Sequence, residues 1–188
     1  MPFSQSSQLS TIVGFAEQLK PASVLDVGVG MGQYGFLLRT NLENIALFDI
    51  DGATASQRPR ERWGVVIDGI EGYAGYLTPV HHYAYNRLMI GDALALLPGI
   101  ADGAYELVMA IDILEHLSVD EGQQFLRHCR RIARRAALVS TPKVFVAQEV
   151  EANPLENHRS LWGREMLLAA GFATVLDNAE SWIAVNSA

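Results

Sequence analysis

Acidic side chains and a histidine follow one apolar segment of this sequence, at the point where a strand would end. In the stretch AIDILEHL, the residues Asp112, Glu115 and His116 come directly after a run of apolar residues. A histidine can take a proton from a hydroxyl near neutral pH, which makes His116 a candidate general base. The alternative is that Glu115 and His116 only cap the following turn or bond to the backbone.

A glycine-rich turn follows the first strand-like segment, in VLDVGVGMGQYG. Gly28, Gly30 and Gly32 come directly after the run that contains Asp26. Glycines at this place let the backbone turn tightly and let a ligand approach the main chain. Their spacing does not meet the G-x-G-x-x-G pattern of dinucleotide sites, and Asp26 would repel phosphates. The loop therefore suits a cationic or amine-bearing ligand, or else it is a plain structural turn.

Two acids are candidates for holding a ribose. Asp49, in IALFDIDGAT, lies about 20 residues beyond the glycines, as expected for an acid that ends a second strand. Glu71, in VVIDGIEGY, lies much farther along. The Asp-x-Asp-Gly string around Asp49 also resembles the nucleophile motif of haloacid-dehalogenase-type phosphatases. That motif needs Thr or Val next, where Ala53 stands, so a phosphatase is only a remote alternative.

The elements that must position these residues alternate between strand and helix. Alternation of this kind predicts a doubly wound α/β fold with a mostly parallel sheet covered by helices on both faces. Ligands of such sheets bind at the carboxyl ends of the strands, where every candidate above falls. Strands are expected at 23–30, 64–73, 105–117 and 136–142, and a strand, a turn and a short helix within 87–98. Helices are expected at 8–19, 33–41, 73–86, 120–135 and 163–172, and a closing hairpin at 173–186. Pro79 should kink or divide its helix, and the segment 41–64 should be irregular.

The motifs together resemble those of class I S-adenosylmethionine-dependent methyltransferases. VLDVGVGMG matches the family's first motif, RLMIGDA resembles its third-strand segment, and DILEH resembles its Asp-x-Leu-Glu-His segment. The resemblance implies one Rossmann-like domain over residues 1–188, with a seven-stranded sheet in the order 3-2-1-4-5-7-6 and strand 7 antiparallel. It implies S-adenosylmethionine as the cofactor. The implied cofactor contacts are Asp26, Gly28, Gly30, Gly32, Glu71, Asp92, Ala93 and Asp112.

The order of motifs favours Glu71 over Asp49 for the ribose. In the family, one helix and one strand separate the ribose acid from the residues that match Asp92 and Ala93. The chain after Glu71 supplies that helix and strand, whereas Asp49 would leave the strand around Ile67 without a place. The pattern is also similar to a group of bacterial methyltransferase-like proteins that carry GIE before GDA and an extended segment after the first helix, here 41–64.

A later cluster extends the resemblance. The stretch from STP to Trp162 contains His158 and is similar to small-RNA 2′-O-methyltransferases, which bind a divalent metal through an acid-x-x-Glu-His segment and a later histidine. The residues that match here are Asp112, Glu115, His116 and His158. Asp112 replaces a longer glutamate, so the sequence leaves metal dependence open. Through the resemblance, His158 joins Glu115 and His116 as a candidate catalytic group.

The net charge and the cysteine count limit the partners and the compartment that we expect for this chain. The chain has 188 residues, a net charge of −7 and one cysteine, Cys129. An acidic chain attracts polyanions poorly, so nucleic acid is an unlikely partner. The single cysteine suggests a reducing compartment, and no targeting segment or membrane span is evident. We expect a soluble, cytoplasmic domain without membrane contact, and a homodimer is compatible with this interpretation.

The predicted activity is methyl transfer to an O, N or C nucleophile. The acceptor is expected to be a small molecule or a sugar, held by the N-terminal helix and the segments 41–64 and 142–162. The alternative from another class is a non-catalytic domain of the same fold that binds S-adenosylmethionine or a partner protein.

Overall fold

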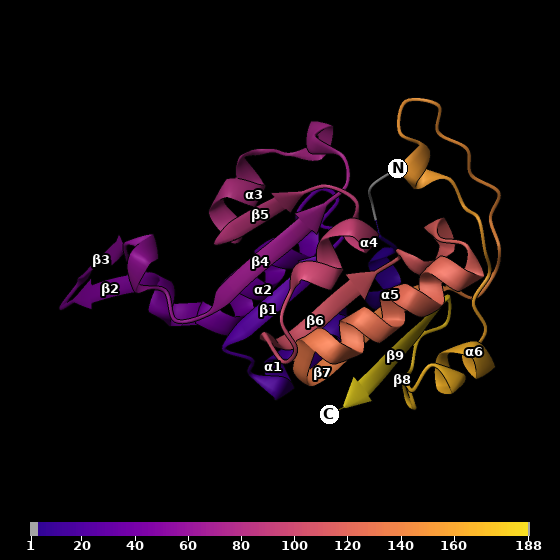
Figure 1. Ribbon diagram of the computed structural model, residues 1–188. Coiled ribbons are helices and arrows are strands. Elements are labelled where there is room, and N and C mark those ends of the chain that lie inside the picture. The colour runs from indigo at the N-terminus through magenta and orange to yellow at the C-terminus, as the bar shows by residue number, and fades with distance from the viewer. Residues whose placement is uncertain (1–3, 188) are drawn as a thin grey trace.

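The computed structural model, which describes residues 4–187, is built around a central seven-stranded sheet (Figure 1). Its order is β5-β4-β1-β6-β7-β9-β8, and all strands are parallel except β9, which is antiparallel to both neighbours. When only the seven strands of this sheet are numbered along the chain, the order is 3-2-1-4-5-7-6, as predicted. The strands are β1 (Ser23–Val27), β4 (Val66–Glu71), β5 (Arg87–Ile90), β6 (Tyr105–Ile111), β7 (Ala133–Pro142), β8 (Thr174–Leu176) and β9 (Ser181–Ser187).

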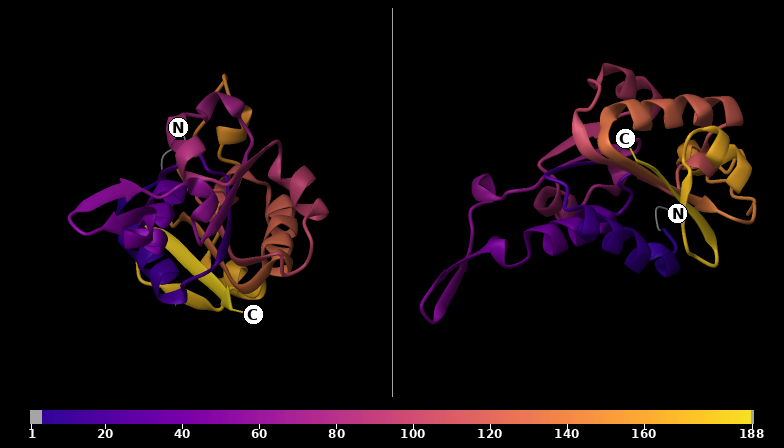
Figure 2. Two further views of the ribbon diagram at one scale, coloured as in Figure 1. Left: turned by 90° about the vertical axis from the view of Figure 1, so that its left-hand side faces the viewer. Right: turned by 90° about the horizontal axis from the view of Figure 1, so that it is seen from below.

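Helices cover the sheet on both faces (Figures 1 and 2). The helices are α1 (Leu9–Leu19), α2 (Gln33–Glu43), α3 (Pro79–Ala84), α4 (Ala93–Leu96), α5 (Val119–Ile132) and α6 (Arg164–Ala169). Side chains of α1, α2 and α3 share one core with alternate strand residues such as Val24 and Ile67. Side chains of α5 and α6 form the other core with strand residues that face the opposite side of the sheet, such as Leu25 and Ile70. The alternation follows from the two-residue repeat of strands, so each central strand is buried on both sides.

Helix α5 shows how sequence signals set an element. Ser118 and Glu121 form a reciprocal capping box at its start. Its apolar stripe is wholly buried against the sheet and includes Cys129. The predicted extension to residue 135 is wrong, because Ala133 already begins strand β7. Arg134 and Arg135 therefore lie on that strand, where both pair with Glu106.

The predicted helix at 73–86 is divided, one of the two outcomes expected from Pro79. A short 3-10 turn at Ala74–Tyr76 is followed by α3, in which Pro79 occupies the first helical position. Proline is favoured there because its missing N–H would have no partner in the helix.

The segment 41–64 is more ordered than predicted. It forms a two-stranded antiparallel sheet of β2 (Phe48–Asp51) and β3 (Thr54–Gln57), separate from the main sheet. Gly52 and Ala53 connect the strands, and Gly52 has a φ of 57°, which a tight hairpin turn favours at this position. The hairpin projects from the side of the domain (Figures 1 and 2). Within residues 4–187, no helix is both long and apolar enough to cross a membrane.

Candidate active site

A cavity of about 370 Å³ opens at the carboxyl ends of β1, β4 and β6. Most of the residues selected from the sequence lie on its wall. They are Gly28, Gly30, Glu71, Asp92, Ala93, Asp112, Glu115, His116 and His158. Asp26 and Gly32, which were also selected, are not among the residues that line it.

The glycine loop has a left-handed backbone that excludes side chains. Gly28, Gly30 and Gly32 have φ values of 79°, 51° and 79°, a region that L-residues with a Cβ seldom adopt. A Cβ on Gly28 would lie 2.1 Å from Cδ1 of Ile113, so an alanine there would also require the Ile113 side chain to move. The main chain is thereby left bare toward the cavity.

His81 holds this loop in place through a hydrogen bond to its backbone, a role that the sequence did not reveal. Its Nδ1 accepts the backbone N–H of Thr78 at 3.0 Å, so the proton must lie on Nε2, which donates to the carbonyl of Gly30 at 2.9 Å. The ring is fully buried. The Thr-Pro-x-His string could have indicated the helix cap, but nothing local to it indicates the contact with Gly30.

Glu71 ends β4 beside the glycine loop and is almost wholly buried. One carboxylate oxygen accepts the N–H of Gly30 and the other accepts the N–H of Tyr73, each at 2.9 Å. Burial raises the pKa of Glu71, while these two N–H groups oppose the rise. Each oxygen keeps a further lone pair for a ligand, so the carboxylate is fixed in place and can accept two more hydrogen bonds.

Asp49 has a different environment. It lies on the hairpin, where its carboxylate pairs with Arg58 at 3.0 Å and with Arg62. It is absent from the wall of the cavity. The geometry therefore agrees with Glu71, not Asp49, as the acid available to a ligand.

Asp26 lies behind the wall and is bonded within the protein. Its carboxylate accepts the hydroxyl of Tyr85 at 2.6 Å. Burial raises the pKa of Asp26 to about 7, against the lowering effect of Tyr85 and with a further rise from Glu71. Tyr85 also explains why residue 35 is a glycine, because a Cβ there would lie 2.1 Å from the phenol ring. Asp26 thus braces the first strand against α2 and α3.

Asp112 and Tyr34 define one end of the cavity. Asp112 has a φ of 54°, and its carboxylate accepts Gln8 Nε2 at 2.6 Å and Ser140 Oγ at 3.0 Å. Burial raises its pKa, and these hydrogen bonds lower it. Tyr34 lines the same cavity, and its buried hydroxyl has no hydrogen-bond partner within the described part of the chain. Buried polar groups are rarely left unpaired, so this hydroxyl is a polar group of the wall that residues 4–187 do not pair.

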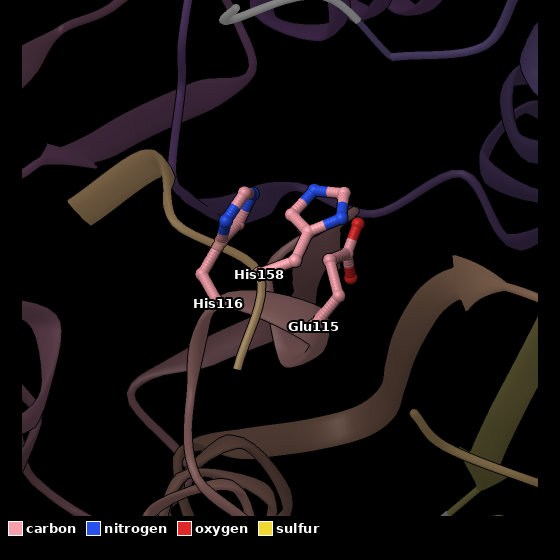
Figure 3. Close-up of side chains that lie close together, drawn as sticks. All are labelled: Glu115, His116 and His158. Atoms are coloured by element: carbon pink, nitrogen blue, oxygen red, sulfur yellow. The ribbon is translucent and has the colours of Figure 1, made fainter. Parts of the chain in front are cut away.

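Glu115, His116 and His158 form a cluster at the cavity wall (Figure 3). Each offers one ligand atom, and these atoms lie within 4.8 Å of one another. Burial raises the pKa of Glu115 to about 8, and nearby Asp112 adds to the rise. Burial and the neighbouring His158 lower the pKa of His116. The lowered pKa of His116 favours its neutral imidazole, whose lone pair a general base or a metal ligand requires.

The backbone fixes the tautomers of both histidines. His116 Nδ1 faces the carbonyl of Asn157 at 3.4 Å, and His158 Nδ1 faces the carbonyl of Val146 at 2.5 Å. Because a carbonyl only accepts, the ring protons belong on Nδ1, which leaves the Nε2 lone pairs available. Metal-binding histidines commonly show this arrangement. Asp112, the fourth residue of the predicted metal set, does not belong to the three-residue cluster.

The remaining wall corrects the prediction for the acceptor site. No residue of 41–64 lines the cavity, so that segment was wrongly expected to help build it. Residues of the loop after β7 line it, as predicted, whereas no residue of the N-terminal helix α1 does and only Ser4 and Gln5 before that helix reach it. The lining residues of the loop include Val146, Gln148, Asn153, Leu155 and Arg159. Among the described residues, acids outnumber the single arginine on the wall. The cavity therefore favours cationic or neutral ligands over anions.

Solved structures show which fold this is. The N-terminal domain of EvdMO1, solved in the presence of S-adenosylhomocysteine and D-fucose, is 18% identical, with a TM-score of 0.64 over 98% of this chain and 84% of that one. An S-adenosylmethionine-dependent methyltransferase from Archaeoglobus fulgidus is 13% identical, with a TM-score of 0.58 over 95% and 94%. The methyltransferase domain of bacterial CtHen1-CN is 16% identical, with a TM-score of 0.60 over 97% and 98%.

The chain has the class I methyltransferase fold. This confirms the fold predicted from the motifs. No family model matches the sequence, and no curated protein matches it. The methyltransferase fold thus rests on structure, with sequence identities too low to transfer an acceptor.

Proposed function

We propose that this protein is an S-adenosylmethionine-dependent methyltransferase acting on a small-molecule or sugar acceptor. The observation that carries the proposal is the pairing of the bare glycine loop with the Glu71 carboxylate at one wall of the cavity. A carboxylate held by two main-chain N–H groups is preorganised to accept the two hydroxyls of a ribose. The same residues fit the cofactor in charge, since the acidic wall suits its cationic sulfonium and ammonium groups.

The chain's own residues have distinct tasks in this proposal. Glu71 holds the ribose, Asp92 and Ala93 lie at the adenine, and the loop from Gly28 to Gly32 accommodates the amino-acid part. When bound, the cofactor supplies a methyl group on a sulfonium, which needs no acid to help it leave. The protein then mainly positions the acceptor, a contribution worth up to about 7–11 kcal/mol in favourable cases.

In this proposal His116 and Glu115 take the proton of the acceptor. The tautomer fixed by Asn157 leaves Nε2 of His116 able to take a proton from a hydroxyl or amine. His158, whose ring centroid lies 4.9 Å from that of His116, completes the wall. We assign these three residues to acceptor activation.

The same cluster is suited to a divalent transition metal. Two imidazole nitrogens and one carboxylate are ligands that such ions accept, and all three residues line the cavity. Titrating Mn²⁺ into the protein by calorimetry tests this, with His158→Ala as the variant that should lose binding. Absence of heat at millimolar metal would leave the cluster as a metal-free acid–base group.

The experiment that tests the main proposal has two parts. Calorimetry with S-adenosylmethionine and S-adenosylhomocysteine should show binding of both, and labelled cofactor should methylate a component of a small-molecule cell extract. If neither nucleotide binds, the proposal is wrong. Binding without any methylated product would favour the non-catalytic alternative.

A further inference from the structure

The hairpin of residues 48–57, here called the arm, is exposed over nearly its whole length. In β2 only Asp49 is partly covered, and all four residues of β3 are exposed. A two-stranded hairpin on its own is marginally stable in water. The arm also points away from the domain (Figures 1 and 2), so the body of its own chain does not cover it.

One face of the arm is apolar. Phe48 and Ile50 alternate with Asp49 and Asp51, and they pair across the hairpin with Gln57 and Ala55. Because directly opposite residues share a face, Phe48, Ile50 and Ala55 lie together and the acids lie on the reverse. Phe48 is 44% and Ile50 is 58% exposed. Large apolar side chains gathered on a projecting element indicate an interaction surface.

A second, partly exposed aromatic patch, in which Trp63 and Tyr83 are half-buried, lies at the root of the arm. Tyr83 contacts Phe36, with ring centroids 6.1 Å apart, and Trp63, with centroids 5.3 Å apart. Phe36 is 42% exposed. The root therefore presents an aromatic surface, called here the root patch (Phe36, Trp63 and Tyr83), within the same region of the molecule as the arm.

The tip of the arm is acidic, whereas its root is basic. Asp51 stands at the tip and makes no ion pair with any described residue, while the root carries three arginines, at 58, 60 and 62, against Asp49 and Glu61. The root is thus locally basic in a chain whose net charge is −7. An acidic tip would be attracted to such a root.

We propose that the arm mediates a two-fold homodimer, in which each arm packs on the root patch of the other copy. A two-fold axis places the same surface on both copies, and two antiparallel arms bring each tip to the opposite root. One arrangement then covers the apolar face of both arms and brings Asp51 near the arginines of the partner. The cavity lies at the other end of the sheet and stays open.

The test is the mass of the full chain in solution, measured by sedimentation equilibrium from about 1 to about 200 µM. Wild type should dimerise, and the double variant Phe48→Ser/Ile50→Ser should be monomeric while keeping the wild-type melting temperature to within a few degrees. The matched control Val144→Ser removes a side chain that is 71% exposed outside the arm, and it should remain dimeric.

Cross-linking tests the tip-to-root geometry. Cys129 is buried, so added thiols react without competition from it. Mixing the single variants Asp51→Cys and Arg62→Cys should give a mixed disulfide dimer in excess over either homodimer. A wild type that is monomeric at all concentrations, or a Phe48→Ser/Ile50→Ser variant that still dimerises, would overturn the proposal. A predominance of Asp51→Cys homodimers would overturn this geometry.

Discussion

Two regions of the molecule each carry an acid on a strand, with opposite results. Around Glu71 the acid is buried, held by two main-chain N–H groups and turned to a cavity. Around Asp49 the acid lies on a projecting hairpin, neutralised by Arg58 and Arg62. The string around Asp49 resembles a catalytic motif more closely. The comparison teaches that position in the parallel sheet, and not the string itself, makes an acid available to a ligand.

The two glycines of left-handed φ in these regions should differ most. In Gly28→Ala the new Cβ clashes with Ile113 in a left-handed backbone, and we expect a loss of roughly 3–5 kcal/mol in the free energy of unfolding. Gly52→Ala meets no atom within 4 Å, so only the backbone penalty of about 1 kcal/mol remains. Urea denaturation measures both. Equal losses would mean that the crowding at Gly28 has no consequence.

Acids of the two regions should give pH effects of opposite sign. The folded protein raises the pKa of Asp26 to about 7 from 3.8, so it holds a proton that the unfolded chain has released. Stability from this group therefore falls as pH rises from about 4 to about 7. Asp26→Asn keeps an acceptor for Tyr85, and its stability relative to wild type should rise by roughly 3–4 kcal/mol across that range.

Asp49 provides the matched control for this pH experiment. Slight burial raises its pKa, but hydrogen bonds from Arg58 and Arg62 outweigh that effect and leave the pKa lowered. Its contribution is present at neutral pH and is lost as pH falls through the folded-state pKa. In thermal melts at several pH values, Asp49→Asn should thus approach wild type on acidification. The same sign of change for both variants would contradict the assignment.

Cofactor affinity distinguishes the two regions directly. Glu71→Ala should weaken S-adenosylmethionine binding at least tenfold, because a charge-assisted hydrogen bond is worth roughly 1.5–3 kcal/mol. Asp49→Ala should change it less than about twofold, since Asp49 has no place on the cavity wall. Calorimetry gives both dissociation constants. A larger loss in Asp49→Ala than in Glu71→Ala would reverse the ribose assignment.

The smallest expected effect concerns the unpaired hydroxyl of Tyr34. Tyr34→Phe keeps the ring and removes only the hydroxyl, which has no partner within residues 4–187. Affinity for the cofactor should fall by roughly twofold to tenfold, the value of one neutral hydrogen bond. Stability without ligand should stay unchanged or rise slightly. Calorimetry paired with melting curves separates the two quantities, and unchanged affinity would place the cofactor away from this hydroxyl.

Much of the fold followed from the sequence because its signals were local. The glycines after β1, the apolar stripe of α5 and the alternation of elements depend on neighbouring residues, so the doubly wound fold class could be predicted from them. The order of the strands was implied by the resemblance of the motifs to the methyltransferase family. The choice of Glu71 was likewise a matter of counting elements. His81 and the segment 41–64 could not be resolved in this way. His81 acts on Gly30, which is distant in sequence, and the hairpin lacks a core that would impose a pattern.

The position of Asp26 shows another limit of sequence reasoning. The acid before the glycine loop was expected at the cofactor, yet the structure places it behind the wall on Tyr85. Spacing indicates the strand on which a side chain lies, but the packing of distant elements decides whether that side chain is covered.

A buried arginine at the root of the arm has a practical consequence. Arg39 is fully buried and donates to Val65, Ala84, Asn86 and Glu43, and Glu43 in turn accepts the N–H of Val65. The chain is therefore clamped where it leaves α2 and where it re-enters at β4. Because both ends are held, the arm between α2 and β4 can accept an insertion without a change in the main sheet. A peptide inserted at Gly52 would lie far from the cavity and leave the strand that carries Glu71 undisturbed, while it would block the proposed contact of the arm with a second copy.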